Sequence, residues 1–219
     1  MDPAFGPQRP ASVRTEGLSR AFDEVFVVRD AAMGLDEAAV VSLIGANGSG
    51  KTTFLRIVAG VLAPSAGSVS VCGRAPGQGL ASYVAPGDRM LNWRLTGRQN
   101  LEFFARIAGR RRAFVPAAVR DAAAMLDAVD LLDKHVGECS TGQRRRLMLA
   151  TGFVPCAPVI LLDEPYADLD RDGRDAVAAA ARHWADAGGI VMYAAPVEED
   201  GPPADVVFGL RAGSVERVR

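Results

Sequence analysis

The octapeptide GANGSGKT at residues 45–52 most constrains how this chain can fold, because it fits the pattern G-x-x-x-x-G-K-[ST] in full. A continuous apolar run at residues 38–45 leads into it, as is typical of a strand buried on both faces. The segment that follows carries Phe54, Leu55 and Val58 at helical spacing. A glycine-rich loop between a strand and a helix arranges backbone N–H groups as a nest for phosphate. The sequence therefore predicts a phosphate-binding loop.

Individual roles follow from the chemistry of this loop. Lys51 is expected to reach the β- and γ-phosphates of a nucleotide, and the Thr52 hydroxyl to ligate magnesium. Other loop residues would surround the phosphates at a helix N-terminus, where the helix dipole favours an anion. The loop residues predicted to contact the nucleotide are Asn47, Gly48, Ser49, Gly50, Lys51, Thr52 and Thr53.

A second buried strand, PVILLDEP at residues 158–165, ends in two carboxylates. Asp163 is expected to hold Mg²⁺, directly or through water, opposite Thr52. Glu164 is the candidate catalytic base that would orient and deprotonate an attacking water. Two carboxylates at a strand end can also simply cap a loop, but the phosphate loop in the same chain favours the catalytic interpretation. Together the two motifs indicate a P-loop NTPase without specifying its kind.

The order of segments predicts an α/β fold: a P-loop NTPase core with a mostly parallel sheet, an antiparallel β edge and an inserted helical lobe. We predict one domain over residues 1–219, with a flexible tail at 1–11, the core at 12–90 and 151–219, and the lobe at 91–150. The edge strand is residues 67–73, which alternate as in a hairpin. A helix over 170–187 is expected to end at Gly188, and the next buried strand to follow at 190–193.

Two helices are predicted inside the lobe. Thr96 followed three residues later by Gln99 forms a capping box, and Gly109 is a plausible helix stop. In the second helix, one face is expected to be apolar. The residues of that face are Val115, Val119, Ala122, Leu126 and Val129.

Composition excludes several classes of protein. The net charge of −1 and the 49% hydrophobic content argue against a nucleic-acid scaffold or a disordered chain. The spacing of Cys72, Cys139 and Cys156 suits neither a metal site nor a CxxC pair, so we expect reduced thiols. No apolar run approaches the roughly 18–20 residues that span a bilayer. If the protein works at a membrane, we expect another chain to do the spanning.

A further motif lies before the Asp163 strand, in ECSTGQRRRLMLA at residues 138–150. Ser140, Gly142 and Gln143 offer a hydroxyl, backbone amides and a side-chain amide at the start of a predicted helix, which is a second surface for a phosphate. One chain cannot easily fold this surface onto its own phosphate loop across the helical lobe. The motif therefore suggests head-to-tail pairing, with nucleotide between two subunits.

Taken in order, these segments resemble the ATP-binding subunit of an ABC transporter from about residue 13 to residue 219. GANGSGKTT resembles the Walker A loop, CSTGQ the signature and VILLDEP the Walker B strand. The resemblance implies that Phe22, in SRAF, stacks on adenine, and that Asp170, in ADLD, reaches across the dimer. It also implies that the lobe segment NWRLTGRQNLEFFARIAG meets a membrane partner, although Trp93, Phe103 and Phe104 are expected in the core.

The chain departs from the family pattern in three places. In the signature, Cys139 and Thr141 replace the usual Leu and first Gly. In the loop after ASYV, Pro86 stands where the family has a Gln that contacts Mg²⁺ and the attacking water. Asp88 and Arg89 are the nearby polar residues that could substitute for that Gln.

The third departure is at the end of the last buried strand, in IVMYAAPVEED. Ala195 stands where the family has a His that contacts the γ-phosphate. The two histidines of the chain lie elsewhere: His135 near the lobe, and His183 on the helix before this strand, where we expect a surface or half-buried position. ATP binding should survive these losses, whereas hydrolysis should be slowed.

The resemblance predicts an ATP-binding and ATP-hydrolysing subunit with Mg²⁺, paired with a second ATP-binding subunit and with a multi-pass permease. It would sit peripherally at the cytoplasmic face of the membrane, driving transport, most simply export, with no nucleic acid. One alternative is a weakly hydrolysing regulatory cassette that pairs with an intact partner. Another is an ATPase of DNA repair or translation, for which the runs at residues 110–112 and 144–146 would be DNA-binding patches. That alternative is disfavoured because the chain has neither a long coiled-coil insertion nor a tandem cassette.

Overall fold

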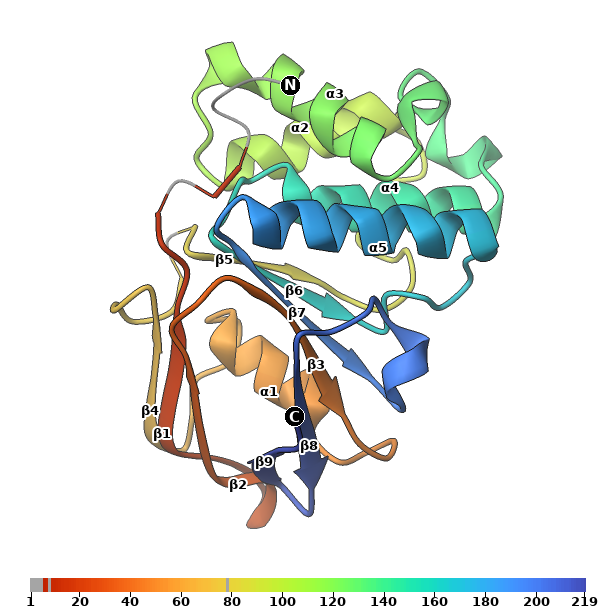
Figure 1. Cartoon of the computed structure of the whole chain (residues 1–219). Helices are drawn as coiled ribbons and strands as arrows, with labels where there is room; N and C mark the ends of the chain where they lie inside the picture. The colour runs from red at the N-terminus through yellow and green to blue at the C-terminus, as the bar shows by residue number, and fades with distance from the viewer. Residues whose placement is uncertain (1–5, 8, 78) are drawn as a thin grey trace.

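The computed structural model describes residues 6, 7, 9–77 and 79–219. Most of the predicted flexible tail, residues 1–5 and 8, lies outside the described residues. The chain forms a lower part built on two sheets and an upper part of helices (Figure 1). It is an α/β protein with a mostly parallel sheet, as predicted.

The main sheet has six strands in the order β5-β6-β7-β3-β8-β9. Its first five strands are parallel, and β9 pairs antiparallel with β8 at the edge. The strand bounds are β3 Ala39–Ile44, β5 Ala81–Val84, β6 Val159–Asp163, β7 Ile190–Ala195, β8 Val206–Arg211 and β9 Ser214–Arg217. β7 therefore lies between β6 and β3, and it runs two residues further than the sequence pattern predicts.

A second, antiparallel sheet has the order β2-β1-β4. Its strands are β1 Val13–Phe22, β2 Val25–Leu35 and β4 Ala66–Val71. The antiparallel edge is thus present, but as a separate sheet that faces the main one across the helix α1, Lys51–Val58 (Figure 1). β4 is an edge strand as predicted, although its partner is β1 and not a strand adjacent in sequence.

Burial on both faces explains why the central strands are continuously apolar. In β3, Val40 belongs to the core under the helices of one face, and Val41 to the core around α1 on the other. Because side chains alternate along a strand, both sets of positions must be hydrophobic. Helices α4, Thr141–Phe153, and α5, Arg171–Asp186, cover the face opposite α1.

The upper part contains α2, Gly97–Ile107, and α3, Val115–Met125, which pack on α4. Four short 3₁₀ helices complete the secondary structure: η1 Arg112–Phe114, η2 Val129–Leu131, η3 Val136–Glu138 and η4 Glu198–Asp200. Within the part of the chain that the structure describes, no helix is long and apolar enough to cross a membrane. The three cysteines, all within the described residues, form no disulfide.

The predicted start of α2 is confirmed. Thr96 accepts the Gln99 N–H at 3.2 Å, while the Gln99 side chain accepts the Thr96 N–H at 2.9 Å. Gly109 follows the helix with a φ of 80°. In α3 the predicted apolar face is buried except for Val129, which is 50% exposed because the helix ends at Met125 and the chain turns before it.

We predict that Thr96→Ala lowers the free energy of unfolding by about 1 kcal/mol, because the first turn of α2 loses the acceptor for a backbone N–H. Urea denaturation of both proteins measures the difference. Ser68→Ala, which removes an exposed hydroxyl from β4, is the control and should change stability by less than about 0.5 kcal/mol. Equal effects of the two substitutions would contradict the capping role.

Candidate nucleotide site

The glycine-rich loop joins the end of β3 to the start of α1, at the carboxyl edge of the main sheet. Gly50 is the N-cap of α1 and has a φ of 105°, in the left-handed region. A Cβ atom at this position would stand 2.5 Å from the Val27 carbonyl oxygen. Glycine is therefore required here both by the backbone conformation and by the close approach of β2.

Lys51 is nearly buried, with 7% of its surface exposed. Its Nζ donates to the carbonyl oxygens of Gly45 at 2.6 Å and Ala46 at 3.0 Å, so the side chain lies back across the loop. Burial lowers the pKa of Lys51, and the nearby carboxylates of Asp163 and Glu164 act in the opposite direction. The ammonium is thus held where the loop and the acidic end of β6 meet.

The predicted phosphate and metal residues line one hollow of about 260 Å³. Its walls come from the loop, from the start of α1, from β2 and from the end of β6. The lining residues are Val27, Asn47, Gly48, Gly50, Lys51, Thr52, Thr53, Asp163 and Glu164. Ser49 is the one predicted loop residue turned elsewhere: it lines a different hollow with Ile44 and Leu210.

Asp163 is 2% exposed and accepts a hydrogen bond from the Tyr83 hydroxyl at 3.0 Å. Burial raises the pKa of Tyr83 to about 12, so the phenol stays protonated and donates. The Thr52 hydroxyl and the Asp163 carboxylate are hard oxygen donors that open into the same hollow, which suits the ligand preference of Mg²⁺. Tyr83 was missed by sequence reasoning, although the parallel pairing of β5 with β6 places its strand beside Asp163.

Glu164 follows directly after β6 and is exposed, with a φ of 50°. A non-glycine residue in this left-handed conformation costs about 1–2 kcal/mol, so neighbouring bonds must hold it. The Glu164 N–H donates to the Ala194 carbonyl at 2.9 Å. On its other side, the Glu164 carbonyl accepts from Arg145 Nη2 at 2.7 Å. The backbone of the candidate base is therefore fixed at both ends.

A second hollow of about 250 Å³ adjoins the first, because Asn47 and Glu164 line both. Its further walls are formed by Tyr166, Ala167, Arg174, Pro196 and Asp200. The Arg174 guanidinium lies 5.4 Å from the centre of the Tyr166 ring. Glu164 thus stands between the phosphate loop on one side and a pocket with cationic and acidic side chains on the other.

The signature residues lie at the start of α4, in the upper half of the molecule, whereas α1 and its loop lie in the lower half (Figure 1). Ser140 accepts the Gln143 N–H at 3.2 Å, and the Gln143 side chain accepts the Ser140 N–H at 3.0 Å. Gly142, the second residue of the helix, lies between them in the chain. None of the described residues that line the phosphate hollow belongs to this segment.

The other two residues implied by the family resemblance are also apart from the loop. Asp170 caps α5 by accepting the Gly173 N–H at 2.8 Å and also bonds Arg146 at 3.0 Å. The Gly173 bond, followed by the Arg146 bond, lowers the pKa of Asp170. Phe22 ends β1, is 44% exposed, and has the Arg20 guanidinium 4.6 Å from its ring centre.

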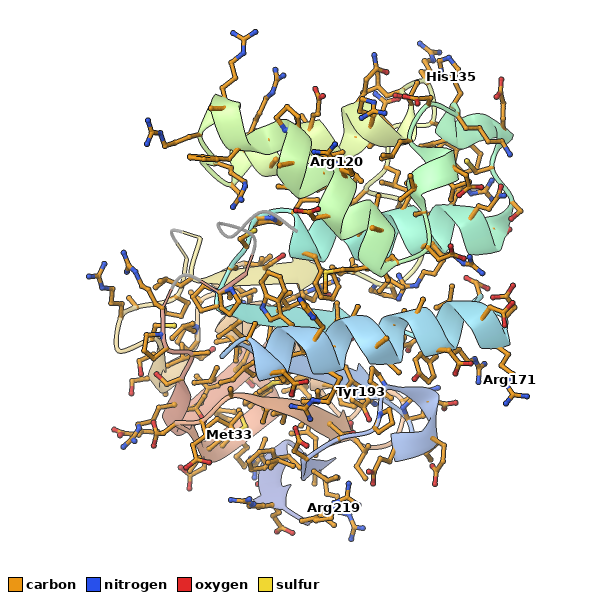
Figure 2. All side chains as sticks on the ribbon, turned by 45° about the horizontal axis from the view of Figure 1, so that its top comes forward. Met33, Arg120, His135, Arg171, Tyr193 and Arg219 are labelled. Atoms are coloured by element: carbon orange, nitrogen blue, oxygen red, sulfur yellow. The ribbon has the colours of Figure 1, made fainter. Side chains whose placement is uncertain are left out.

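At the two positions where a Gln and a His are expected from the resemblance, Pro86 and Ala195, no described side chain offers an amide or an imidazole. Pro86 is exposed in the loop after β5, and Ala195 is fully buried at the end of β7. His135 lies at the outer end of the helical part, away from the sheet that carries Tyr193 (Figure 2). His183 is exposed on α5, within the range expected for it. Asp88 bonds Arg144 Nε at 2.5 Å instead of entering the hollow.

The prediction that Trp93 and Phe103 belong to the core is wrong. They are 50% and 55% exposed: Trp93 is in the turn before α2, with the Arg144 guanidinium over its ring, and Phe103 is on the outer face of α2. Phe104, partly buried, packs against the core as predicted. The Arg110–Arg112 run follows α2, and its last two members are exposed as expected for a solvated terminus.

Comparisons with known proteins identify the family. The family model described as ABC transporter matches residues 28–167. The cytochrome c biogenesis ATP-binding export protein CcmA of Maricaulis maris is 34% identical over 202 residues, which cover 90% of this chain and 91% of that protein. The chain therefore belongs to the ABC transporter family, as an ATP-binding subunit.

Two further comparisons bear on length and fold. NatA of Bacillus subtilis, an ABC transporter ATP-binding protein, is 32% identical over 162 residues, and the match spans 66% of its length, just under two thirds. The dimeric ATP-binding cassette MJ0796, solved in a post-hydrolysis state with ADP and Pi, has a TM-score of 0.81 at 18% identity. That match covers 94% of this chain and 99% of that one, and it supports the fold.

We predict that Gly50→Ala weakens MgATP binding at least about ten-fold, because the added Cβ strains the backbone and meets the Val27 carbonyl. Gly188→Ala is the matched control: its φ is 97°, but nothing lies within 4 Å of the added atom. Calorimetric titration measures both affinities. Both variants should lose stability, but a loss of affinity in Gly188→Ala equal to that in Gly50→Ala would contradict the prediction.

Proposed function

We propose that this chain binds and hydrolyses MgATP to drive a membrane transporter, and that it works as an exporter subunit. The observation that carries the proposal is the single hollow that combines the phosphate loop, Lys51 and the two carboxylates at the end of β6. Export rests on the likeness to CcmA, which is named an export protein. The phosphate loop and the metal-binding oxygens would bind nucleotide even though the family's Gln and His are missing.

Each residue has a role that its position supports. Lys51 would move from its loop carbonyls to the β- and γ-phosphates, which offer the ammonium a stronger, charge-assisted partner. Thr52 and Asp163 would hold Mg²⁺, which neutralises charge on the phosphates. Glu164 would accept a proton from the attacking water, since its carboxylate opens into the same hollow.

A second ATP-binding subunit would complete the site. Ser140, Gly142 and Gln143 lie at the N-terminus of α4, outside the phosphate hollow of their own chain. Their amides and hydroxyl would bind the nucleotide held by the partner, and Asp170 would face that partner as well. We propose head-to-tail dimerisation for this reason, with either an identical chain or a related one.

An apolar hollow of about 290 Å³ between the core and the helical part would receive the permease. Val61, Met90 and Ile107 line it and are 64%, 46% and 63% exposed. Exposed apolar side chains gathered in one hollow mark an interaction surface. Docking there would hold the chain peripherally at the cytoplasmic face of the membrane. The cargo would then be chosen by the permease.

Hydrolysis would be slower than in a cassette that has all of the family's groups. Pro86 offers neither a side-chain amide nor an N–H, and Ala195 offers no polar atom at the end of β7. Groups that position water contribute several kcal/mol to a barrier, so their loss reduces a rate without abolishing it. A regulatory cassette with little turnover is the second candidate, and these same two positions favour it.

We predict that Lys51→Ala weakens MgATP binding at least about ten-fold, because the phosphates lose their buried cation. Glu164→Gln should keep the affinity within about two-fold while turnover falls about 100-fold, because the base is lost but the charge pattern around the phosphates remains. Equilibrium binding and steady-state phosphate release measure the two effects. Glu37→Gln, in an exposed loop, is the control. Wild-type turnover no higher than that of Glu164→Gln, with binding intact, would support the regulatory candidate instead.

We further predict that Pro86→Gln raises turnover several-fold without changing the affinity for MgATP, because it would supply the side-chain amide that the family resemblance implies for this loop. Pro86 is exposed, so the longer side chain meets no core. Pro203→Gln, also exposed, is the matched control and should leave turnover unchanged. Unchanged turnover in Pro86→Gln would show that the missing amide does not limit the rate.

A further inference from the structure

Arg145, in the first turns of α4, is one of the most buried side chains of the protein, with 1% of its surface exposed. Burial lowers the pKa of this guanidinium, and the carboxylates of Asp168, Asp163, Glu164 and Asp88 act in the opposite direction. Among the described residues, no carboxylate lies within ion-pair distance of it, and its buried Nε has no hydrogen-bond partner. A buried arginine without an ion pair needs other partners, because an unsatisfied charge is strongly unfavourable.

Those partners are four backbone carbonyl oxygens in two separate segments. Nη1 donates to Ala85 at 3.0 Å and to Gly87 at 3.1 Å, in the loop after β5. Nη2 donates to Asp163 at 3.0 Å and to Glu164 at 2.7 Å, at the end of β6. Each terminal nitrogen therefore binds one segment, and the planar guanidinium fixes the distance between the two segments.

The end of β6 lines the proposed site of hydrolysis, and Arg145 ties the loop after β5 to it. That loop contains Pro86, at the position of the missing amide. The other segment contains Glu164, whose left-handed backbone is held on one side by Ala194 and on the other by Arg145. With Ala195 at the end of β7, no polar side chain from that position holds the glutamate in place.

We propose that Arg145 is a positioning residue for ATP hydrolysis. It binds the backbone carbonyl of Glu164, links Glu164 to the loop around Pro86, and thereby sets the direction of the Glu164 carboxylate. The inference rests on the proposed function, since it concerns the rate of that reaction. It assigns the residue no contact with nucleotide: Arg145 does not line the phosphate hollow.

The guanidinium geometry gives a sharp test. Lysine keeps the positive charge. Its single ammonium group, however, cannot bind both pairs of carbonyl oxygens, which in Arg145 are bound by two nitrogens held at a fixed distance. Arg145→Lys should therefore lower kcat about ten-fold or more, while KM and the Kd for MgATP stay within about two-fold. Arg145→Gln, which is neutral, provides a second variant should the lysine disturb folding. Arg106→Lys, on the exposed face of α2, is the matched control. Thermal melts identify the variants that fold.

A double-mutant cycle separates positioning from a purely structural role. If Arg145 acts through Glu164, then Arg145→Lys in the Glu164→Gln background should change the residual turnover by less than about two-fold. Multiplicative losses, or a rise in Kd parallel to the fall in kcat, would overturn the positioning role, as would an unchanged kcat in folded Arg145→Lys and Arg145→Gln. A wild-type chain without turnover above Lys51→Ala would overturn the proposed function and the positioning role together.

Discussion

The parallel pairing of β7 with its two neighbours is the constraint on which the site depends. In this register Ala194 lies beside Leu43 of β3 and beside Asp163 of β6. The three strands therefore end at one edge of the sheet, and the chain leaves β3 directly into the phosphate loop. Because carboxyl ends of parallel strands meet at the same edge, Lys51 and the β6 carboxylates must share a hollow. The same register brings the Ala194 carbonyl to the N–H of Glu164.

Residues whose role depends on local pattern could be predicted from the sequence. The glycine-rich loop, the strand that ends in Asp163 and the capping box at Thr96 each show their chemistry within a few residues. Tyr83 and Arg145 could not be predicted, because their partners lie 80 and 18 or more residues away along the chain. Trp93 was misplaced because it lies in a turn before the Thr96 cap of α2, where the local pattern does not show which side chains are buried; in the structure the Arg144 guanidinium lies over its ring.

The three consecutive arginines of α4 show how one helical turn connects separate parts of the site. Successive helical residues point about 100° apart, so each arginine meets a different neighbour. Arg144 bonds Asp88, in the loop after β5. Arg145 binds the carbonyls of that loop and of the end of β6. Arg146 bonds Asp127 and Asp170, the cap of α5. The run at residues 144–146, which in the sequence resembles a patch for nucleic acid, therefore makes its contacts within the chain.

These contacts bear on how the candidate base Glu164 is held in place. The backbone of Glu164 is bonded by Ala194 and Arg145, which belong to the same subunit. In the function we propose, a partner then adds the signature surface to a base that is already in place. Arg145 and the signature residues Ser140 and Gln143 occupy the same first turns of α4. In the function we propose, these signature residues bind the nucleotide held by the partner, whereas Arg145 binds Glu164 of its own subunit. A movement of α4 on binding the partner's nucleotide would therefore be transmitted through the guanidinium to Glu164 in the subunit's own site.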